Sequence, residues 1–225
     1  MAGRQESRYL KMNNKVKIIR WIFGNIPDQM RAPTGGIRGW LAKKIMETNA
    51  SSTREAIQRL ALHQNDTFVE LGTGHGASLR KIAEMDELSI PKRIVCVEIS
   101  ETFRNELQQT IANLPIKLPI EIYGQDCIKM PYLGDSTVTK MFGMNVVYFL
   151  NPLPEYLKEI NRVMKQNGNV VFGCKFGVLP NYTEEFVNKD PKYIANAMKE
   201  AGFDVTTEKV EVYAGNYLEI KGTKR

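Results

Sequence analysis

The 225-residue sequence is poor in the side chains that hold metals and disulfides. It contains three cysteines and two histidines, and neither a D-x-D nor an H-E-x-x-H pattern occurs. Because the cysteines lie far apart in apolar segments, at Cys96, Cys127 and Cys174, they form neither a disulfide framework nor a zinc-binding spacing. We therefore expect no metal site and a reducing compartment such as the cytoplasm.

Long apolar runs and evenly spread positive charge are also missing. No run of 18 apolar residues occurs, so the sequence predicts no membrane-spanning helix. The net charge is +6, but residues 1–54 hold eleven Lys or Arg and three acids, so the rest of the chain is slightly acidic. This distribution argues against a nucleic-acid-binding face on the main domain.

The basic N-terminal segment has a helical pattern. Residues 10–26 are predicted to form an amphipathic helix with cations around one apolar stripe: Met12, Val16, Ile19, Phe23 and Ile26. Three interpretations stay open: packing on the domain, peripheral contact with a membrane surface, or a mitochondrial-type presequence. Further along, Ser52-Thr53-Arg54-Glu55 predicts, as a capping box, the start of a helix that runs through Ala61.

The chemistry of the chain centres on residues 67–79, Thr-Phe-Val-Glu-Leu-Gly-Thr-Gly-His-Gly-Ala-Ser-Leu. An apolar strand carries the acid Glu70 near its end, and Gly72, Gly74 and Gly76 follow before a helical pattern begins. A cofactor lying against the end of a parallel strand can approach the backbone only where no Cβ projects. The pattern also permits a dinucleotide, but Glu70 would repel a pyrophosphate and favours an amino-acid-bearing nucleoside.

Further apolar segments alternate with helical patterns, which is typical of an α/β fold. The second strand ends in another acid, Glu98, and Ser100 is positioned to cap the helix that follows. Asp190-Pro191 predicts the start of a late helix. The predicted strands after the first are 93–98, 120–123, 138–143, 169–174, 205–212 and 217–220.

The stretch 67–79 resembles motif I of the class I S-adenosylmethionine-dependent methyltransferases, whose pattern is apolar-E/D-apolar-G-x-G-x-G. Residues 162–168 are similar to the family's R-V-L-K-P-G-G segment, and the resemblance covers roughly residues 33–223. It implies a doubly wound, mostly parallel, seven-stranded Rossmann-like sheet with an antiparallel C-terminal hairpin strand and an N-terminal helical cap. Residues 1–50 would form the basic helical extension and residues 51–225 the methyltransferase domain.

The same resemblance implies a site for S-adenosyl-L-methionine. Glu70 would hold the methionine amino group, Glu98 would accept hydrogen bonds from the ribose hydroxyls, and Asp126 would accept one from the adenine amino group. The other cofactor-binding positions implied lie in the loops at the same strand ends: Gly72, Thr73, Gly74, Gly76, Ile99, Cys127 and Asn145.

The segment after the fourth predicted strand bears on the methyl acceptor. Two valines follow Asn145, in place of the N-P-P-[Y/F] signature of relatives that methylate amino groups of nucleic acid bases. Tyr148 and Phe149 stand where many quinone and sterol relatives carry histidines, so Tyr148 and Asn145 are the nearest candidates if a general base is needed. Alignment and exclusion of water can suffice without one, because a sulfonium is already activated.

We therefore predict an S-adenosylmethionine-dependent methyltransferase that acts on a small-molecule or lipid-like acceptor. In similar methyltransferases the helices before the first strand shape the acceptor pocket, which makes Thr34, Gly35 and Trp40 candidates for a lid. Two alternatives stay open: an NAD(P)-dependent oxidoreductase, which the glycine loop permits, and a cofactor-binding protein without catalytic activity.

Overall fold

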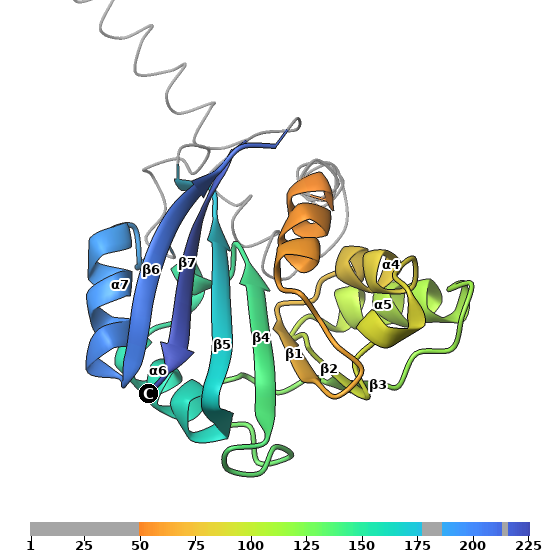
Figure 1. Cartoon of the computed structure of the whole chain (residues 1–225), viewed down its shortest axis with the longest axis horizontal. Helices are drawn as coiled ribbons and strands as arrows, with labels where there is room; N and C mark the ends of the chain where they lie inside the picture. The colour runs from red at the N-terminus through yellow and green to blue at the C-terminus, as the bar shows by residue number, and fades with distance from the viewer. Residues whose placement is uncertain (1–49, 177–185, 213–215) are drawn as a thin grey trace, which may run out of the picture.

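A computed structural model describes residues 50–176, 186–212 and 216–225 of the chain (Figure 1). The predicted amphipathic helix at residues 10–26 and the lid candidates Thr34, Gly35 and Trp40 lie outside the described residues. The division into an extension and a domain therefore stays a prediction.

Seven strands form one sheet in the order β3-β2-β1-β4-β5-β7-β6. Neighbouring strands run parallel except at β7, which is antiparallel to both β5 and β6. This arrangement confirms the mostly parallel seven-stranded sheet with an antiparallel C-terminal strand. The strands are β1 (Thr67–Leu71), β2 (Arg93–Val97), β3 (Ile120–Tyr123), β4 (Val138–Met144), β5 (Met164–Cys174), β6 (Phe203–Val210) and β7 (Tyr217–Lys224).

Helices cover both faces of the sheet, as expected for a doubly wound fold (Figure 1). One buried cluster joins the sheet to α6 and α7, and a second joins it to the helical residues 50–59, α4 and α5. The helices are α4 (Ala77–Ile82), α5 (Glu101–Ala112), α6 (Leu153–Val163) and α7 (Pro191–Glu200), with short 3-10 turns η1 (Glu87–Ser89) and η2 (Val147–Phe149).

Local sequence signals fix where several helices begin. The Ser100 side chain accepts a hydrogen bond from Phe103 N at 3.3 Å and caps α5, as the sequence predicted. Asp190 caps α7 in the same way, and Pro191 occupies its first turn, where the missing N–H has no helical partner to lose. These caps set the helix starts independently of tertiary packing.

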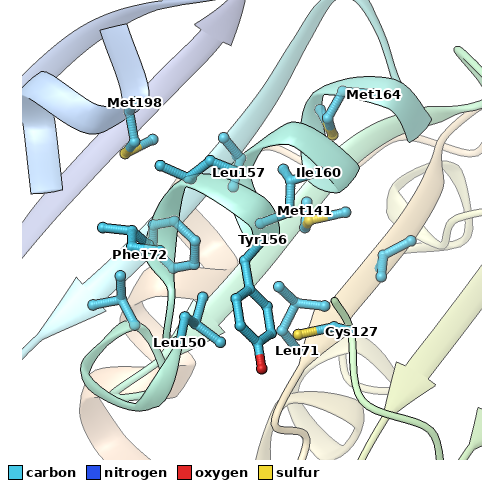
Figure 2. Close-up of a cluster of buried hydrophobic side chains, with 14 of the residues drawn as sticks. Leu71, Cys127, Met141, Leu150, Tyr156, Leu157, Ile160, Met164, Phe172 and Met198 are labelled. Atoms are coloured by element: carbon cyan, nitrogen blue, oxygen red, sulfur yellow. The ribbon is translucent and has the colours of Figure 1, made fainter. Parts of the chain in front are cut away.

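The apolar side of α6 packs against the centre of the sheet (Figure 2). Leu157 and Ile160 are fully buried on this side, against strand residues such as Met141 and Phe172. Tyr156 lies at the edge of the same cluster, between Leu150 and Cys127, so α6 brings a hydroxyl group to the carboxyl ends of the strands (Figure 2).

Several predicted boundaries need correction, among them β6, which spans Phe203–Val210 in place of the predicted 205–212. The chain is already helical at residue 50, so the helix does not begin at the capping box, and Ser52 is buried instead. Strand β5 begins at Met164, because the turn at residues 165–168 is accommodated as an irregularity between two stretches of pairing with β4. Strand β7 extends to Lys224 because it pairs along its full length with β6.

Within the described ranges, no helix has the length and apolar character needed to cross a membrane. In the same ranges, no three or more His, Cys, Asp or Glu side chains are grouped so that they could hold a metal ion.

Candidate active site

The glycine loop after β1 is held in a conformation that suits glycine. Gly72, Gly74 and Gly76 have φ angles of 65°, 58° and 83°, in the left-handed region that other residues rarely adopt. The Gly72 N–H donates to Val97 O at 2.8 Å, which ties the loop to the end of β2. A Cβ added at Gly76 would lie 2.8 Å from Leu107 Cδ1, so Gly76 allows α4 to pack closely on α5 and does not line the cavity.

Glu70 and Glu98 lie on the same face of the sheet. Side chains alternate along β1 and β2, and Phe68 and Cys96, two residues before each acid, belong to the cluster beneath α4 and α5. Glu70 lies within β1, whereas Glu98 follows the last residue of β2. Because β1 and β2 are parallel neighbours, the two carboxylates meet at one edge of the sheet.

Backbone amides hold the Glu98 carboxylate in place. One oxygen accepts a hydrogen bond from Gly74 N at 2.8 Å and the other from Ser100 N at 2.9 Å. The side chain thus connects the glycine loop to the start of α5, and it still has lone pairs available for a ligand.

Burial raises the pKa of both carboxyl groups, Glu70 and Glu98. Desolvation raises the pKa of Glu70 to about 8, while the Ser78 hydroxyl, which donates to Glu70, opposes that rise. Desolvation also raises the pKa of Glu98, against the opposing hydrogen bonds from Ser100 and Gly74. A cationic group bound beside Glu70 would favour its ionised form and relieve the cost of burying it.

Asp126 is held in the loop after β3. One carboxylate oxygen accepts a hydrogen bond from Ile128 N, and the other accepts one from the Tyr156 hydroxyl, both at 3.0 Å. Burial raises the pKa of the Cys127 thiol to about 12, so this side chain stays protonated and contributes apolar surface.

The end of β4 is held by a second hydrogen-bond network. Asn145 has a positive φ of 56°, and its N–H donates to Gly173 O at 2.7 Å. Its side-chain oxygen accepts from the Tyr148 hydroxyl at 3.2 Å and from Lys175 N at 3.1 Å. Tyr148 is fully buried, and desolvation raises its pKa far above the ordinary value. Its hydroxyl therefore lies behind the cavity wall in protonated form.

A single cavity joins these groups, with an empty volume of about 1090 Å³ including its open mouth. Eight of the predicted residues line it: Glu70, Gly72, Thr73, Glu98, Ile99, Asp126, Cys127 and Asn145. Three predicted residues, Gly74, Gly76 and Tyr148, do not. Several lining residues were not predicted individually, because they come from helices or from the end of β4 and the loop after it, which carry no residue-specific binding motif: Thr53, Ser78, Phe103, Met144, Val146, Leu150 and Tyr156.

These residues suit a nucleoside that carries an amino acid. Carboxylates can accept from an ammonium group and from ribose hydroxyls, and Asp126 can accept from a base amino group. Because Gly72 has no Cβ, a ligand can approach its backbone beside the strand ends. A Cβ added at this position would lie 3.1 Å from Val146 Cγ2. A larger residue at position 72 would therefore crowd the cavity as well as strain the backbone.

Comparison with known proteins identifies the family that has this arrangement. A family described as "Methyltransferase domain" matches residues 69–172, which run from β1 through β5 and include both acidic strand ends. Residues 69–172 form a methyltransferase domain of the class I S-adenosylmethionine-dependent type. The cofactor that this domain family implies is S-adenosyl-L-methionine, in place of the NAD(P) that the glycine loop also permits.

Similar proteins support the family and the fold. A sterol 4-C-methyltransferase of Caenorhabditis elegans is 26% identical over 129 residues, which make up 57% of this chain and 37% of that protein. This chain therefore spans well under half the length of the curated relative that it matches.

Solved structures share the fold at low sequence identity. An S-adenosylmethionine-dependent methyltransferase from Aquifex aeolicus aligns with a TM-score of 0.62 at 18% identity, over 79% of this chain and 92% of that one. The geranyl diphosphate C-methyltransferase from Streptomyces coelicolor A3(2) aligns with a TM-score of 0.59 at 14% identity, over 78% of this chain and 77% of that one.

Proposed function

We propose that this methyltransferase transfers the methyl group of S-adenosylmethionine to a small-molecule or lipid-like acceptor. The observation that carries the proposal is the division of the cavity into two kinds of surface. Glu70, Glu98 and Asp126 give it a polar side, whereas the segment at and after the end of β4 contributes apolar side chains: Met144, Val146, Phe149 and Leu150. An apolar wall beside a cofactor site suits an acceptor with a hydrocarbon body.

The roles of the polar residues follow from their chemistry and position. Glu70 would accept from the amino group of the methionine moiety, Glu98 from the ribose hydroxyls and Asp126 from the adenine amino group, with Ile99 and the Cys127 backbone beside the base. When bound, S-adenosylmethionine supplies an electrophilic methyl group on a sulfonium. The protein then contributes alignment of the acceptor and a cavity from which water is excluded.

Tyr148 and Asn145 fit a positioning role better than proton transfer. The Tyr148 hydroxyl donates to Asn145 and accepts from the Lys175 backbone, and it does not line the cavity. An amide side chain such as Asn145 is not basic enough to take a proton near neutral pH. We propose that the pair fixes the loop after β4, where the apolar wall begins.

The named relatives agree with an apolar acceptor. One is a sterol methyltransferase and another methylates geranyl diphosphate, and both acceptors have a large hydrocarbon portion. The test is turnover of S-adenosylmethionine to S-adenosylhomocysteine with the full chain and a panel of sterols, isoprenoid diphosphates, phenols and quinone precursors. Turnover with a member of the panel supports the proposal, and Gly72→Val, which should block the cavity, is the matched inactive control.

Two results would contradict this function in different ways. Tight binding of S-adenosylhomocysteine without turnover across the panel would favour the cofactor-binding protein without activity. Turnover only with oligonucleotides would instead contradict the acceptor class.

Peripheral membrane contact remains a separate part of the proposal. The basic, amphipathic pattern at residues 10–26 supports it, because such a segment can place its apolar side in a bilayer and its cations on anionic lipid. Sedimentation with anionic vesicles should be lost on deletion of residues 1–24 while binding of S-adenosylhomocysteine is kept. Absence of sedimentation with the full chain would contradict it.

A further inference from the structure

Lys175 is a buried cation next to the candidate active site. It follows the last residue of β5 and is 9% exposed, an unusual degree of burial for a lysine. Its ammonium group makes no hydrogen bond or ion pair with the rest of the described chain, and burial alone lowers the pKa of Lys175. A buried charge is costly unless it is paired, and because the described residues supply no partner, we expect a ligand to be able to supply one.

The backbone of Lys175 is hydrogen-bonded to a residue that lines the cavity. Its N–H donates to the Asn145 side-chain oxygen at 3.1 Å and also to the Tyr148 hydroxyl. Asn145 lines the cavity, so these bonds hold Lys175 beside the cavity at the adjacent ends of β4 and β5.

Strand alternation indicates which side of the sheet Lys175 occupies. A Cβ added at Gly173, two residues earlier, would lie 2.6 Å from Met144 Cε, so this position faces Met144. Positions 173 and 175 share a face because side chains alternate along a strand. Met144 lines the apolar part of the cavity, and Lys175 follows on the Met144 face of the sheet, at the end of β5 nearest the cavity.

The charges of the cavity are one-sided. Its described lining residues include the carboxyl groups of Glu70, Glu98 and Asp126, but neither lysine nor arginine. The polar side is thus suited to the cationic and donor groups of the cofactor. Lys175 directly follows β5 instead, and its backbone N–H bonds to Asn145 at the end of β4, where the apolar wall begins.

We propose that Lys175 binds an acidic oxygen of the methyl acceptor, as found in a carboxylate, phenolate or enolate attached to an apolar body. This inference rests on the proposed function, and it narrows the acceptor class. The negative oxygen would neutralise the ammonium, while the hydrocarbon body would contact the wall formed by Met144, Val146 and Phe149. Lysine suits this role because its ammonium is a compact charge whose three N–H groups can donate to oxygens in varied positions.

Matched pairs of probes test the proposal with the full chain saturated with S-adenosylhomocysteine. The pairs are 2-naphthoate with 2-naphthamide and octanoate with octanamide, which differ in charge but little in size. We expect the wild-type protein to bind the anion of at least one pair about tenfold more tightly by calorimetry, as expected for a hydrogen bond to a charged group. The proposal is overturned if neither pair shows a preference for the anion.

Three variants separate charge recognition from folding. Lys175→Met should remove the preference for the anion, whereas Lys175→Arg should retain part of it. Lys165→Met is the matched control, because Lys165 is an exposed lysine at the opposite end of β5 and should keep the full preference. An undiminished preference in Lys175→Met contradicts the assignment.

A measurement on the wild-type protein covers the case in which Lys175→Met does not fold. Reductive methylation followed by peptide mass spectrometry should show protection of Lys175 by 2-naphthoate or octanoate, and no protection of Lys165. Equal labelling of Lys175 with and without both probes overturns the proposal. Failure of wild-type protein to bind S-adenosylhomocysteine would instead contradict the cofactor site, so the two failures are distinguishable.

Discussion

Replacement of Glu98 by Ala tests the cofactor site most directly. In the structure, the carboxylate of Glu98 accepts hydrogen bonds from Gly74 N at 2.8 Å and Ser100 N at 2.9 Å, and it also lines the cavity. The substitution removes both a ligand contact and the connection between the glycine loop and α5. We therefore expect weaker cofactor binding together with a less stable fold.

The magnitude follows from the type of bond. A hydrogen bond to a charged group contributes about 1.5 to 3 kcal/mol, which corresponds to a loss of affinity of about 10- to 150-fold. Two buried amides also lose their acceptor, and each unsatisfied group costs about 1 to 3 kcal/mol of folding free energy unless water replaces the carboxylate. The affinity loss should therefore be accompanied by a lower urea midpoint.

Calorimetric titration with S-adenosylhomocysteine measures the first effect, and urea denaturation without ligand measures the second. Glu101→Ala is the matched control, because Glu101 is an exposed acid three positions away that does not line the cavity. It should bind like the wild-type protein. If Glu98→Ala folds and binds within twofold of the wild-type protein, the assignment of Glu98 to the cofactor is refuted.

Three further predictions concern the loop, the buried acid and the wall of the site. Gly76→Ala should lower the free energy of unfolding by about 2 to 5 kcal/mol in urea denaturation, because φ is 83° and the new methyl group would lie 2.8 Å from a side chain of α5. Gly134→Ala, at a negative φ, should cost far less, and equal costs would contradict this reasoning. Burial raises the pKa of Glu70 from 4.5 to about 8, so between these pH values the folded state retains a proton that the unfolded state releases. The stability of the wild-type protein relative to Glu70→Gln should therefore fall as the pH rises through that interval. Denaturation at several pH values measures this dependence, and a relative stability that rises with pH would refute the prediction. Asn188→Ala removes two hydrogen bonds, of 2.7 and 2.8 Å, to the carbonyls of Val147 and Leu150. It should therefore raise the KM of the acceptor while the Kd of S-adenosylhomocysteine stays unchanged. An equal rise in KM and Kd would show that the loop after β4 does not act on the acceptor alone.

The sequence by itself determined the parts of this protein that depend on neighbouring residues. The alternate glycines after β1 require left-handed backbone, and Ser100 and Asp190 cap helices within three residues of themselves. Apolar runs and helical stripes gave the α/β order for the same reason. Such signals act over a few residues, so they can be read without knowledge of the tertiary structure.

The structure adds to the local signals at three places. The capping box at residues 52–55 does not begin a helix, because the chain is already helical at residue 50. Gly76, predicted as part of the cofactor loop, makes room for α5. Tyr148, considered as a base, is buried behind the wall that it helps to hold.

Only the tertiary structure decided which side chains meet at the strand ends. The Tyr156 hydroxyl reaches the Asp126 carboxylate, and the Asn145 side chain reaches the backbone N–H of Lys175, each across 30 positions of sequence. These contacts exist because the sheet places β4 beside both β1 and β5, and because α6 packs on the sheet with Tyr156 at the edge of its buried side. Strand order is a property of the whole folded chain, so no pattern of nearby residues specifies these pairs.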